Sequence, residues 1–358
     1  MDHVTREQND NSSLIHSIED GSVTGLSLSL QALCRTMGSS SVYDDGICKK
    51  LGKGLYGESL AIDLIFEDLH HAADLLRHVF NRTDGVDGWA VFPVASLLTS
   101  NPANLLQSVF DLHAGLKRDN TLITVPGLPD MLGIIEEIVF AGIPINISLI
   151  YSSKQYLKAA EAYLRGLERR IDAGLNPAVP AFISIPIFHL AAALSRELGN
   201  QAAIRTSIAV ARKIYKSMRT LHTSQQWERV YNFGARPLRL IWTDSNDESV
   251  AVSGRSLYEY LVAPFTVAAM SEKAMKRLLS HEPPDLLMPV DGDDCEEILA
   301  SHQKTGLSFK HFSCSLQDDA AAKEVKTWIS LLDVLARKSA ALTQRKAAVV
   351  GQSNTNTI

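Results

Sequence analysis

Paired cysteines, basic clusters and long apolar runs are all missing from this sequence. Its four cysteines lie far apart with no Cys-X-X-Cys pair, which predicts reduced thiols and neither disulfides nor a metal site. Lys and Arg are scattered and the formal net charge is −5, so the basic footprint of a nucleic-acid-binding protein is missing. No apolar run approaches the roughly 20 residues needed to span a bilayer, and the first residues do not resemble a signal peptide. We therefore expect a cytoplasmic, soluble protein with no membrane or nucleic-acid partner.

The composition is that of one large globular core, with 46% hydrophobic and 21% charged residues in 358. This length permits two domains, but α/β barrels often exceed 250 residues as one domain. Both ends of the chain are polar. The sequence therefore predicts flexible tails over residues 1–20 and 346–358 and a single domain over residues 21–345.

Short apolar runs alternate with longer helical patterns along the chain. The predicted strands are Leu26–Leu30, Trp89–Val94, Thr121–Val125, Ile143–Ile150, Ala181–Ile185, Leu238–Thr243 and Thr266–Met270. They are continuous apolar runs, as is typical of parallel strands covered on both faces. Apolar residues at helical spacing predict helices over Leu55–Val79, Pro129–Phe140 and Ser153–Ala173. This β-α repetition indicates a parallel sheet with crossover helices.

The middle of the chain carries a more specific pattern. Residues 143–152 read IPINISLIYS, and they are followed by Gln155-Tyr156 and by EAYLRGLE at residues 161–168. This text resembles the transaldolase family, in which a strand of the type GI-x-VNVTLIFS precedes QY and EAYLxGLE. Asp87-Gly88-Trp89, Gly234-Ala235-Arg236 and Trp242 resemble further family motifs in the same order. The resemblance covers roughly residues 25 to 340. It implies a (β/α)8 (TIM) barrel of the transaldolase type with C-terminal helices and a site at the carboxyl ends of its strands.

The positions that carry the family's chemistry differ in this sequence. Transaldolases form a Schiff base through a lysine in an IKIP strand, and here that strand reads Ile123-Thr124-Val125-Pro126. A threonine hydroxyl does not condense with a ketone to an iminium. The family's proton-transfer glutamate falls in the strand that reads Val91-Phe92-Pro93-Val94, and its first-strand aspartate falls at Gln31.

The resemblance also implies two positions at which the family has cationic residues that hold a sugar phosphate, and this sequence has no cation at either. They fall at His189 and near Glu248, within an acidic run, whereas phosphate recognition favours Arg or Lys. The family's second strand is shortened or missing, because too little chain lies between Arg35 and Tyr43 for a helix and a strand.

The remaining polar residues define the candidate site. By this resemblance, Asn146, Ser148 and Ser184 line a polar pocket, with Gln31, Phe92 and Trp242 as further substrate-binding positions. His189, Asp244 and Thr124 are the catalytic candidates: a histidine can act as a general acid or base near neutral pH, and Asp244 follows a strand end. For each of them a purely structural role remains open, because a satisfied core hydrogen bond gives the same sequence pattern. No cofactor is expected.

Three hypotheses follow for function. The first is a repurposed enzyme that acts by acid/base chemistry and hydrogen bonding on an unphosphorylated small molecule of specialised metabolism, in a cyclisation, isomerisation, lyase or C–C bond reaction. The second is a non-catalytic barrel or partner subunit. The third is an active transaldolase with a displaced lysine, for which Lys117 and Lys154 are the nearest candidates. A homodimer is compatible with all three.

Overall fold

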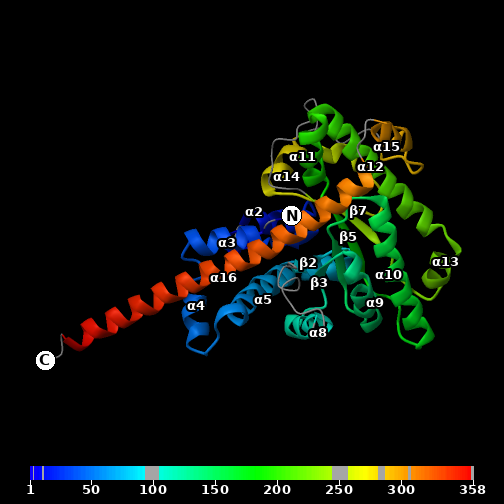
Figure 1. Ribbon diagram of the computed structural model, residues 1–358. Helices are drawn as coiled ribbons and strands as arrows, with labels where there is room; N and C mark the ends of the chain where they lie inside the picture. The colour runs from blue at the N-terminus through cyan, green and yellow to red at the C-terminus, as the bar shows by residue number, and fades with distance from the viewer. Residues whose placement is uncertain are drawn as a thin grey trace. The chain divides into compact units, whose positions relative to one another are not determined.

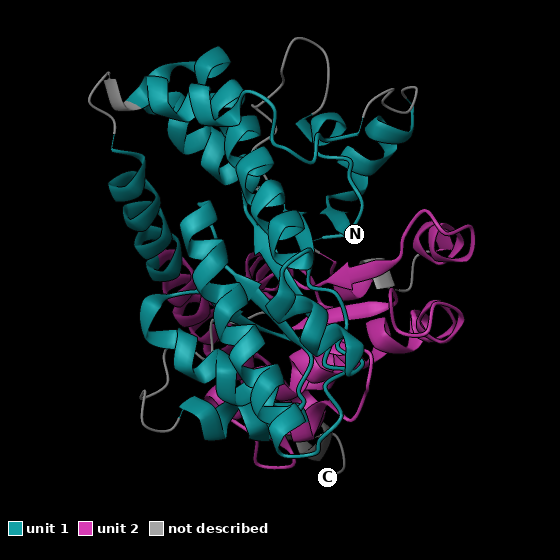
Figure 2. Ribbon diagram, turned by 90° about the vertical axis from the view of Figure 1, so that its right-hand side faces the viewer, with its two compact units in different colours: residues 1–2, 100–113, 122–322 teal, residues 3–99, 114–121, 323–358 magenta. Residues whose placement is uncertain are grey.

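The computed structural model describes residues 1–2, 4–9, 12–92, 105–243, 257–280, 287–304 and 308–355. The chain divides into two compact units, coloured separately in Figure 2. Unit 1 comprises residues 1–2, 100–113 and 122–322, and unit 2 comprises residues 3–99, 114–121 and 323–358. The prediction of one domain over residues 21–345 stays a prediction.

Unit 1 contains a run of parallel strands that pair in chain order, each strand with the next. They are β3 (Thr121–Pro126, with its first residue in unit 2), β4 (Ile145–Ser148), β5 (Ala181–Ile185), β6 (Arg239–Thr243) and β7 (Thr266–Ala269). Every residue of β3, β4 and β5 is buried. Such strands are mostly apolar because both faces of a parallel sheet are covered, as the sequence predicted.

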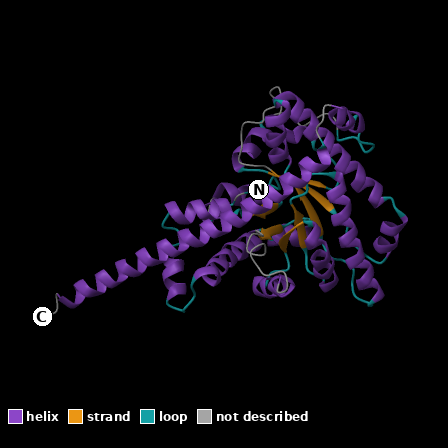
Figure 3. Ribbon diagram, viewed as in Figure 1, coloured by secondary structure: helices purple, strands orange, loops and turns teal. Residues whose placement is uncertain are grey.

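Helices connect and cover these strands (Figures 1 and 3). Unit 1 holds most of α8 (Leu105–Leu116), then η2 (Pro129–Met131), α9 (Leu132–Ala141), α10 (Ser153–Asp172), α11 (Ile187–Leu198), α12 (Asn200–His222), α13 (Gln225–Asn232), η3 (Leu257–Tyr260), α14 (Glu272–Leu279), α15 (Cys295–Lys304) and the start of α16 (Phe309–Thr355). Ser152 caps α10 by accepting a hydrogen bond from the Gln155 amide, and Gly142 ends α9 with a left-handed φ of 84°. The predicted helices at Pro129–Phe140 and Ser153–Ala173 are confirmed.

Unit 2 contains two parallel strands, β1 (Gly25–Ser27) and β2 (Trp89–Phe92). Its helices are α1 (Arg6–Asn9), α2 (Ser12–Glu19), α3 (Leu30–Ser39), α4 (Asp44–Leu51), α5 (Gly57–Leu75), α6 (Arg77–Arg82) and the part of α16 after Ala322. Residues 28–88, all described, contain helices and no strand. This agrees with the prediction that the family's second strand is shortened or missing.

The first strand and both predicted tails differ from the sequence-based expectation. The predicted strand Leu26–Leu30 ends at Ser27, because Ser29 accepts a hydrogen bond from the Ala32 amide and caps α3. The predicted tail over residues 1–20 contains α1 and α2, and Val4 is fully buried in a parallel bridge to Leu28. The predicted C-terminal tail is helical as far as Thr355.

An ion pair explains why the N-terminal residues are ordered. The Arg6 Nε lies 2.5 Å from Oδ1 of the buried Asp68, whose other carboxylate oxygen accepts a hydrogen bond from the Tyr43 hydroxyl at 2.6 Å. A buried carboxylate needs such partners, and the amino-acid composition of the first 20 residues does not reveal them.

In the part of the chain that is described, no helix has both the length and the apolar character needed to cross a membrane.

Candidate functional site

Three predicted site residues form one hydrogen-bonded group on β3, β4 and β5. The register pairs Thr124 with Asn146, and the Asn146 side-chain nitrogen donates to the Thr124 hydroxyl at 3.3 Å. The Ser184 hydroxyl donates to the Asn146 side-chain oxygen at 2.8 Å. All three side chains are buried. The structure therefore brings these candidates together on one face of the sheet.

Ser148 lies on the same face, two residues beyond Asn146 on β4. It is 8% exposed, and its hydroxyl oxygen is buried with no hydrogen-bond partner among the described residues. Buried polar atoms in folded proteins are nearly always hydrogen-bonded, so an unpartnered one calls for an explanation. The Ser148 hydroxyl can therefore form a hydrogen bond with a further polar group, beside the hydrogen-bonded network of Thr124, Asn146 and Ser184.

Trp242 is not part of this group. The register pairs Ser184 with Ile241 and Ile185 with Trp242. Because neighbouring residues on a strand point to opposite faces, Trp242 faces away from Ser184. Its indole N–H donates to the Leu261 carbonyl at 3.1 Å, which satisfies the buried ring nitrogen.

His189 lies in the first turn of α11, just after the carboxyl end of β5. Its Nδ1 is 2.8 Å from the hydroxyl oxygen of Tyr151, and the two rings meet edge to face at 5.7 Å between centroids. Tyr151 follows the carboxyl end of the neighbouring strand β4. The half-buried imidazole is therefore oriented by a second titratable side chain at the same end of these strands.

The other predicted site residues belong to unit 2 or fall outside the described residues. Gln31 is exposed in the first turn of α3, and not on a strand. Phe92 is the last residue of β2, where it is buried and packs on Phe66 with 5.9 Å between ring centroids. Asp244 lies outside the described residues, as do Pro93 and Glu248.

No lysine occurs on any of the seven strands of the structure. The two lysines predicted as displaced nucleophiles are both exposed, Lys117 after the end of α8 and Lys154 in the first turn of α10. Among the described residues, no group of three or more His, Cys, Asp or Glu side chains is arranged to hold a metal ion.

A buried pair of glutamines, missed in the sequence, joins α16 to the strand ends. Gln317 donates to the carbonyl oxygens of Gly127 at 3.0 Å and Leu149 at 2.8 Å, just beyond β3 and β4. Gln155 donates in turn to the Gln317 side-chain oxygen at 3.0 Å. Leu149 has a left-handed φ of 60°, a strained backbone that the bond from Gln317 helps to hold.

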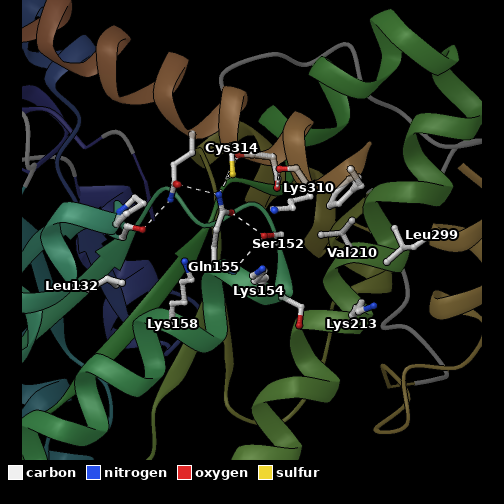
Figure 4. A pocket seen from close by; sticks show the side chains of 16 residues that line it. Leu132, Ser152, Lys154, Gln155, Lys158, Val210, Lys213, Leu299, Lys310 and Cys314 are labelled. Carbon is white, nitrogen blue, oxygen red and sulfur yellow. Dashed lines mark hydrogen bonds between the residues drawn. The ribbon is translucent and has the colours of Figure 1, made fainter. Parts of the chain in front are cut away.

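These glutamines form part of a pocket of about 410 Å³ that lies entirely within unit 1 (Figure 4). Its lining is Gly127, Pro129, Leu132, Ser152, Ser153, Lys154, Gln155, Lys158, Val210, Lys213, Leu299, Phe309, Lys310, Ser313, Cys314 and Gln317. The lining contains four lysines and no acidic residue. None of Thr124, Asn146, Ser148 and Ser184 lines it, so the pocket and the strand-face group are separate features.

Comparison with known proteins agrees with the resemblance found in the sequence. The model of the Transaldolase/Fructose-6-phosphate aldolase family matches residues 8–335. A transaldolase of Thermobifida fusca is 25% identical over 96% of this chain and 96% of its own length. Transaldolase 1 of Streptomyces avermitilis is 24% identical over 94% of this chain and 91% of its own length. A transaldolase of Mycolicibacterium smegmatis is 24% identical, covering 93% and 92% of the two chains.

The family match confirms the predicted fold class, a transaldolase-type TIM barrel, and the seven parallel strands with their connecting helices accord with it. With a match that spans nearly the whole sequence, the chain belongs to the transaldolase/fructose-6-phosphate aldolase family.

Proposed function

We propose that this family member acts on a small unphosphorylated molecule without forming a Schiff base. Thr124 stands where the resemblance places the lysine, and the seven strands carry no lysine in its stead. A hydroxyl donates and accepts hydrogen bonds but supplies no amine for an iminium. Chemistry at this face would therefore depend on hydrogen bonding and proton transfer.

The unpartnered Ser148 hydroxyl is the observation that carries this proposal. Its neighbours Thr124, Asn146 and Ser184 bond to one another, which leaves Ser148 as the polar atom that a ligand's hydroxyl or carbonyl would satisfy. Leaving it unpaired would cost about 1–3 kcal/mol, so a bound polar group would recover free energy there.

His189 is the proposed acid/base residue. The Tyr151 hydroxyl orients its ring at 2.8 Å from Nδ1, and an imidazole can both donate and accept a proton. The reaction classes this suits are isomerisation, cyclisation, elimination and related C–C bond chemistry. Asp244 stays a second candidate by its position in the sequence.

A second candidate function is transaldolase activity from a displaced lysine. The observation that favours it is that Lys154 lines a pocket whose wall includes Gly127 and Ser152, which lie just after β3 and β4. Both functions fit family membership, and imine trapping separates them, because only the second requires a reactive amine.

The test of the first proposal is a binding screen read by thermal unfolding. Unphosphorylated carbonyl and polyol compounds, including dihydroxyacetone and fructose, would be compared with fructose 6-phosphate. We expect an unphosphorylated compound to raise the melting temperature, and Ser148→Ala to weaken its binding about tenfold. Ser195→Ala, at a partly buried serine on α11 that bonds Asn200, is the matched control. A screen without a stabilising unphosphorylated compound, or a hit indifferent to Ser148→Ala, would contradict the proposal.

A further inference from the structure

The lysine-lined pocket of unit 1 combines apolar walls with cationic side chains from several helices. Leu132, Val210, Leu299 and Phe309 supply apolar surface from α9, α12, α15 and α16. Figure 4 shows labelled lysines from α10, α12 and α16 around the same space. A volume of about 410 Å³ falls within the range of pockets that hold small organic molecules.

Three of the four lysines have no ion-pair partner in the described parts of the chain: Lys154, Lys158 and Lys310. The fourth, Lys213, lies 2.7 Å from a carboxylate oxygen of Glu296. Elsewhere in unit 1 the basic side chains are commonly paired, as Arg169 is with Glu136 and Glu137. The pocket therefore concentrates unneutralised positive charge.

Lys154 and Lys158 both lie on α10, where their positive charges experience electrostatic repulsion. Lys154 lies in the first turn, next to the positive end of the helix dipole, and that turn contains no acidic residue. Lys158 follows four residues later, so the two like charges are neighbours on one helix face. An anion at this place would relieve both repulsions and would also pair with Lys310.

The walls around this charge are held in place by buried hydrogen bonds. Gln155 donates to the Ser313 carbonyl at 3.2 Å and to the Gln317 side chain at 3.0 Å. These bonds fix the start of α16 against the start of α10, the two helices that bear the unpaired lysines. A pocket preformed in this way loses little conformational entropy when a ligand binds.

We propose that this pocket binds an organic anion with an apolar body, its acidic group between Lys154, Lys158 and Lys310 and its body against Val210, Leu299 and Phe309. The site is distinct from the strand-face group around Ser148. Its ligand is a hydrophobic carboxylate, sulfonate or phosphate monoester.

The test uses 8-anilinonaphthalene-1-sulfonate, a fluorescent sulfonate with an aromatic body, titrated onto the full chain. We expect saturable binding of one molecule per chain. Lys158→Gln and Lys310→Gln should each weaken this binding about fivefold. Lys276→Gln, which removes a lysine outside the pocket that pairs with Glu272, should leave it unchanged. Equal affinity in all variants, or no saturable binding, would overturn the proposal.

Two further readouts locate the probe. Cys314 is exposed and lines the pocket, so bound probe should slow its alkylation by iodoacetamide, measured by peptide mass. Leu299→Trp should reduce binding by filling the apolar space beside Val210 and Phe309 while the lysines remain. Inorganic phosphate should compete weakly; if it binds as tightly as the probe, the apolar body contributes nothing and that part of the proposal is wrong.

Discussion

Ser184 on β5 donates a hydrogen bond of 2.8 Å to the side-chain oxygen of Asn146 on β4. This bond orients the Asn146 amide so that its nitrogen reaches the hydroxyl of Thr124 on β3. Three adjacent strands are thus joined by side chains as well as by their backbones. Ser148, on the same face, takes no part in this network.

Replacing Ser184 and replacing Ser148 should lower stability by clearly different amounts. Ser184→Ala removes a bonded hydroxyl and leaves a buried Asn146 oxygen short of its donor, so we expect a loss of about 1–3 kcal/mol in the free energy of unfolding. Ser148→Ala removes an unpartnered buried hydroxyl and should cost less than about 0.5 kcal/mol. Urea unfolding of both variants measures the difference. Equal losses would contradict the finding that the Ser184 hydroxyl is hydrogen-bonded and the Ser148 hydroxyl is not.

The glutamine that joins α16 to the strand ends should be a strong determinant of stability in unit 1. Gln317→Leu deprives the Gly127 and Leu149 carbonyls of their donor, and we expect a loss of about 2–4 kcal/mol. Gln226→Leu is the control, because Gln226 makes an exposed hydrogen bond to Glu168 and should change stability by less than about 0.5 kcal/mol. A Gln317 variant as stable as this control would contradict the role of the glutamine pair.

Two glycines, Gly166 on α10 and Gly133 on α9, should respond oppositely to alanine. A Cβ at Gly166 would lie 2.7 Å from the Val139 Cβ and 2.8 Å from the Glu136 carbonyl oxygen, so the two helices would have to separate. We expect Gly166→Ala to cost about 2 kcal/mol. A Cβ at Gly133, on α9, meets nothing within 4 Å, and Gly133→Ala should stabilise by about 0.5–1 kcal/mol. Thermal unfolding of the pair checks both signs, and a stabilising Gly166→Ala would refute the close packing.

His222 should make unit 1 less stable in acid. Burial, with a contribution from the nearby Arg219, lowers the pKa of His222 to about 4, and its ring packs against Trp227 and Phe265. The folded state thus resists protonation that the unfolded state accepts below its ordinary pKa near 6.5. The stability associated with neutral His222 is therefore present above about pH 6.5 and is lost as the pH falls toward 4.

The variant His222→Phe isolates this effect. Wild type should lose up to about 3 kcal/mol relative to the variant between pH 7 and pH 4, because phenylalanine keeps an aromatic ring but takes up no proton. Denaturant unfolding across this range measures the gap. Parallel pH profiles for the two proteins would mean that His222 titrates normally in the folded chain.

The strands were predictable from the sequence because buried parallel strands leave continuous apolar runs, and each of the seven predicted runs overlaps a strand of the structure. Which side chains point to which face of the sheet was less predictable. The run Leu238–Thr243 has no alternation, so nothing in it indicates that Trp242 faces away from Ser184. The end of β1 depended on the cap at Ser29, a local hydrogen bond that outweighs the apolar pattern.

The candidate site was predictable only where its residues share neighbouring strands. Asn146, Ser148 and Ser184 were found through the family's strand motifs, and the register brings them to one face. Gln317 lies 162 residues from Gln155, and no local pattern links them. The lysine-lined pocket was not predictable for the same reason, because its cationic residues converge only when α10, α12 and α16 pack together.

The central claim is that this family member carries out no Schiff-base chemistry, and imine trapping tests it most directly. The protein would be incubated with fructose 6-phosphate and borohydride beside an active transaldolase, and the intact masses would be read. We expect an adduct on the active transaldolase and none on this chain. A reduced adduct on this chain, mapped to Lys154, Lys117 or any other lysine, would contradict the account and establish a displaced nucleophile.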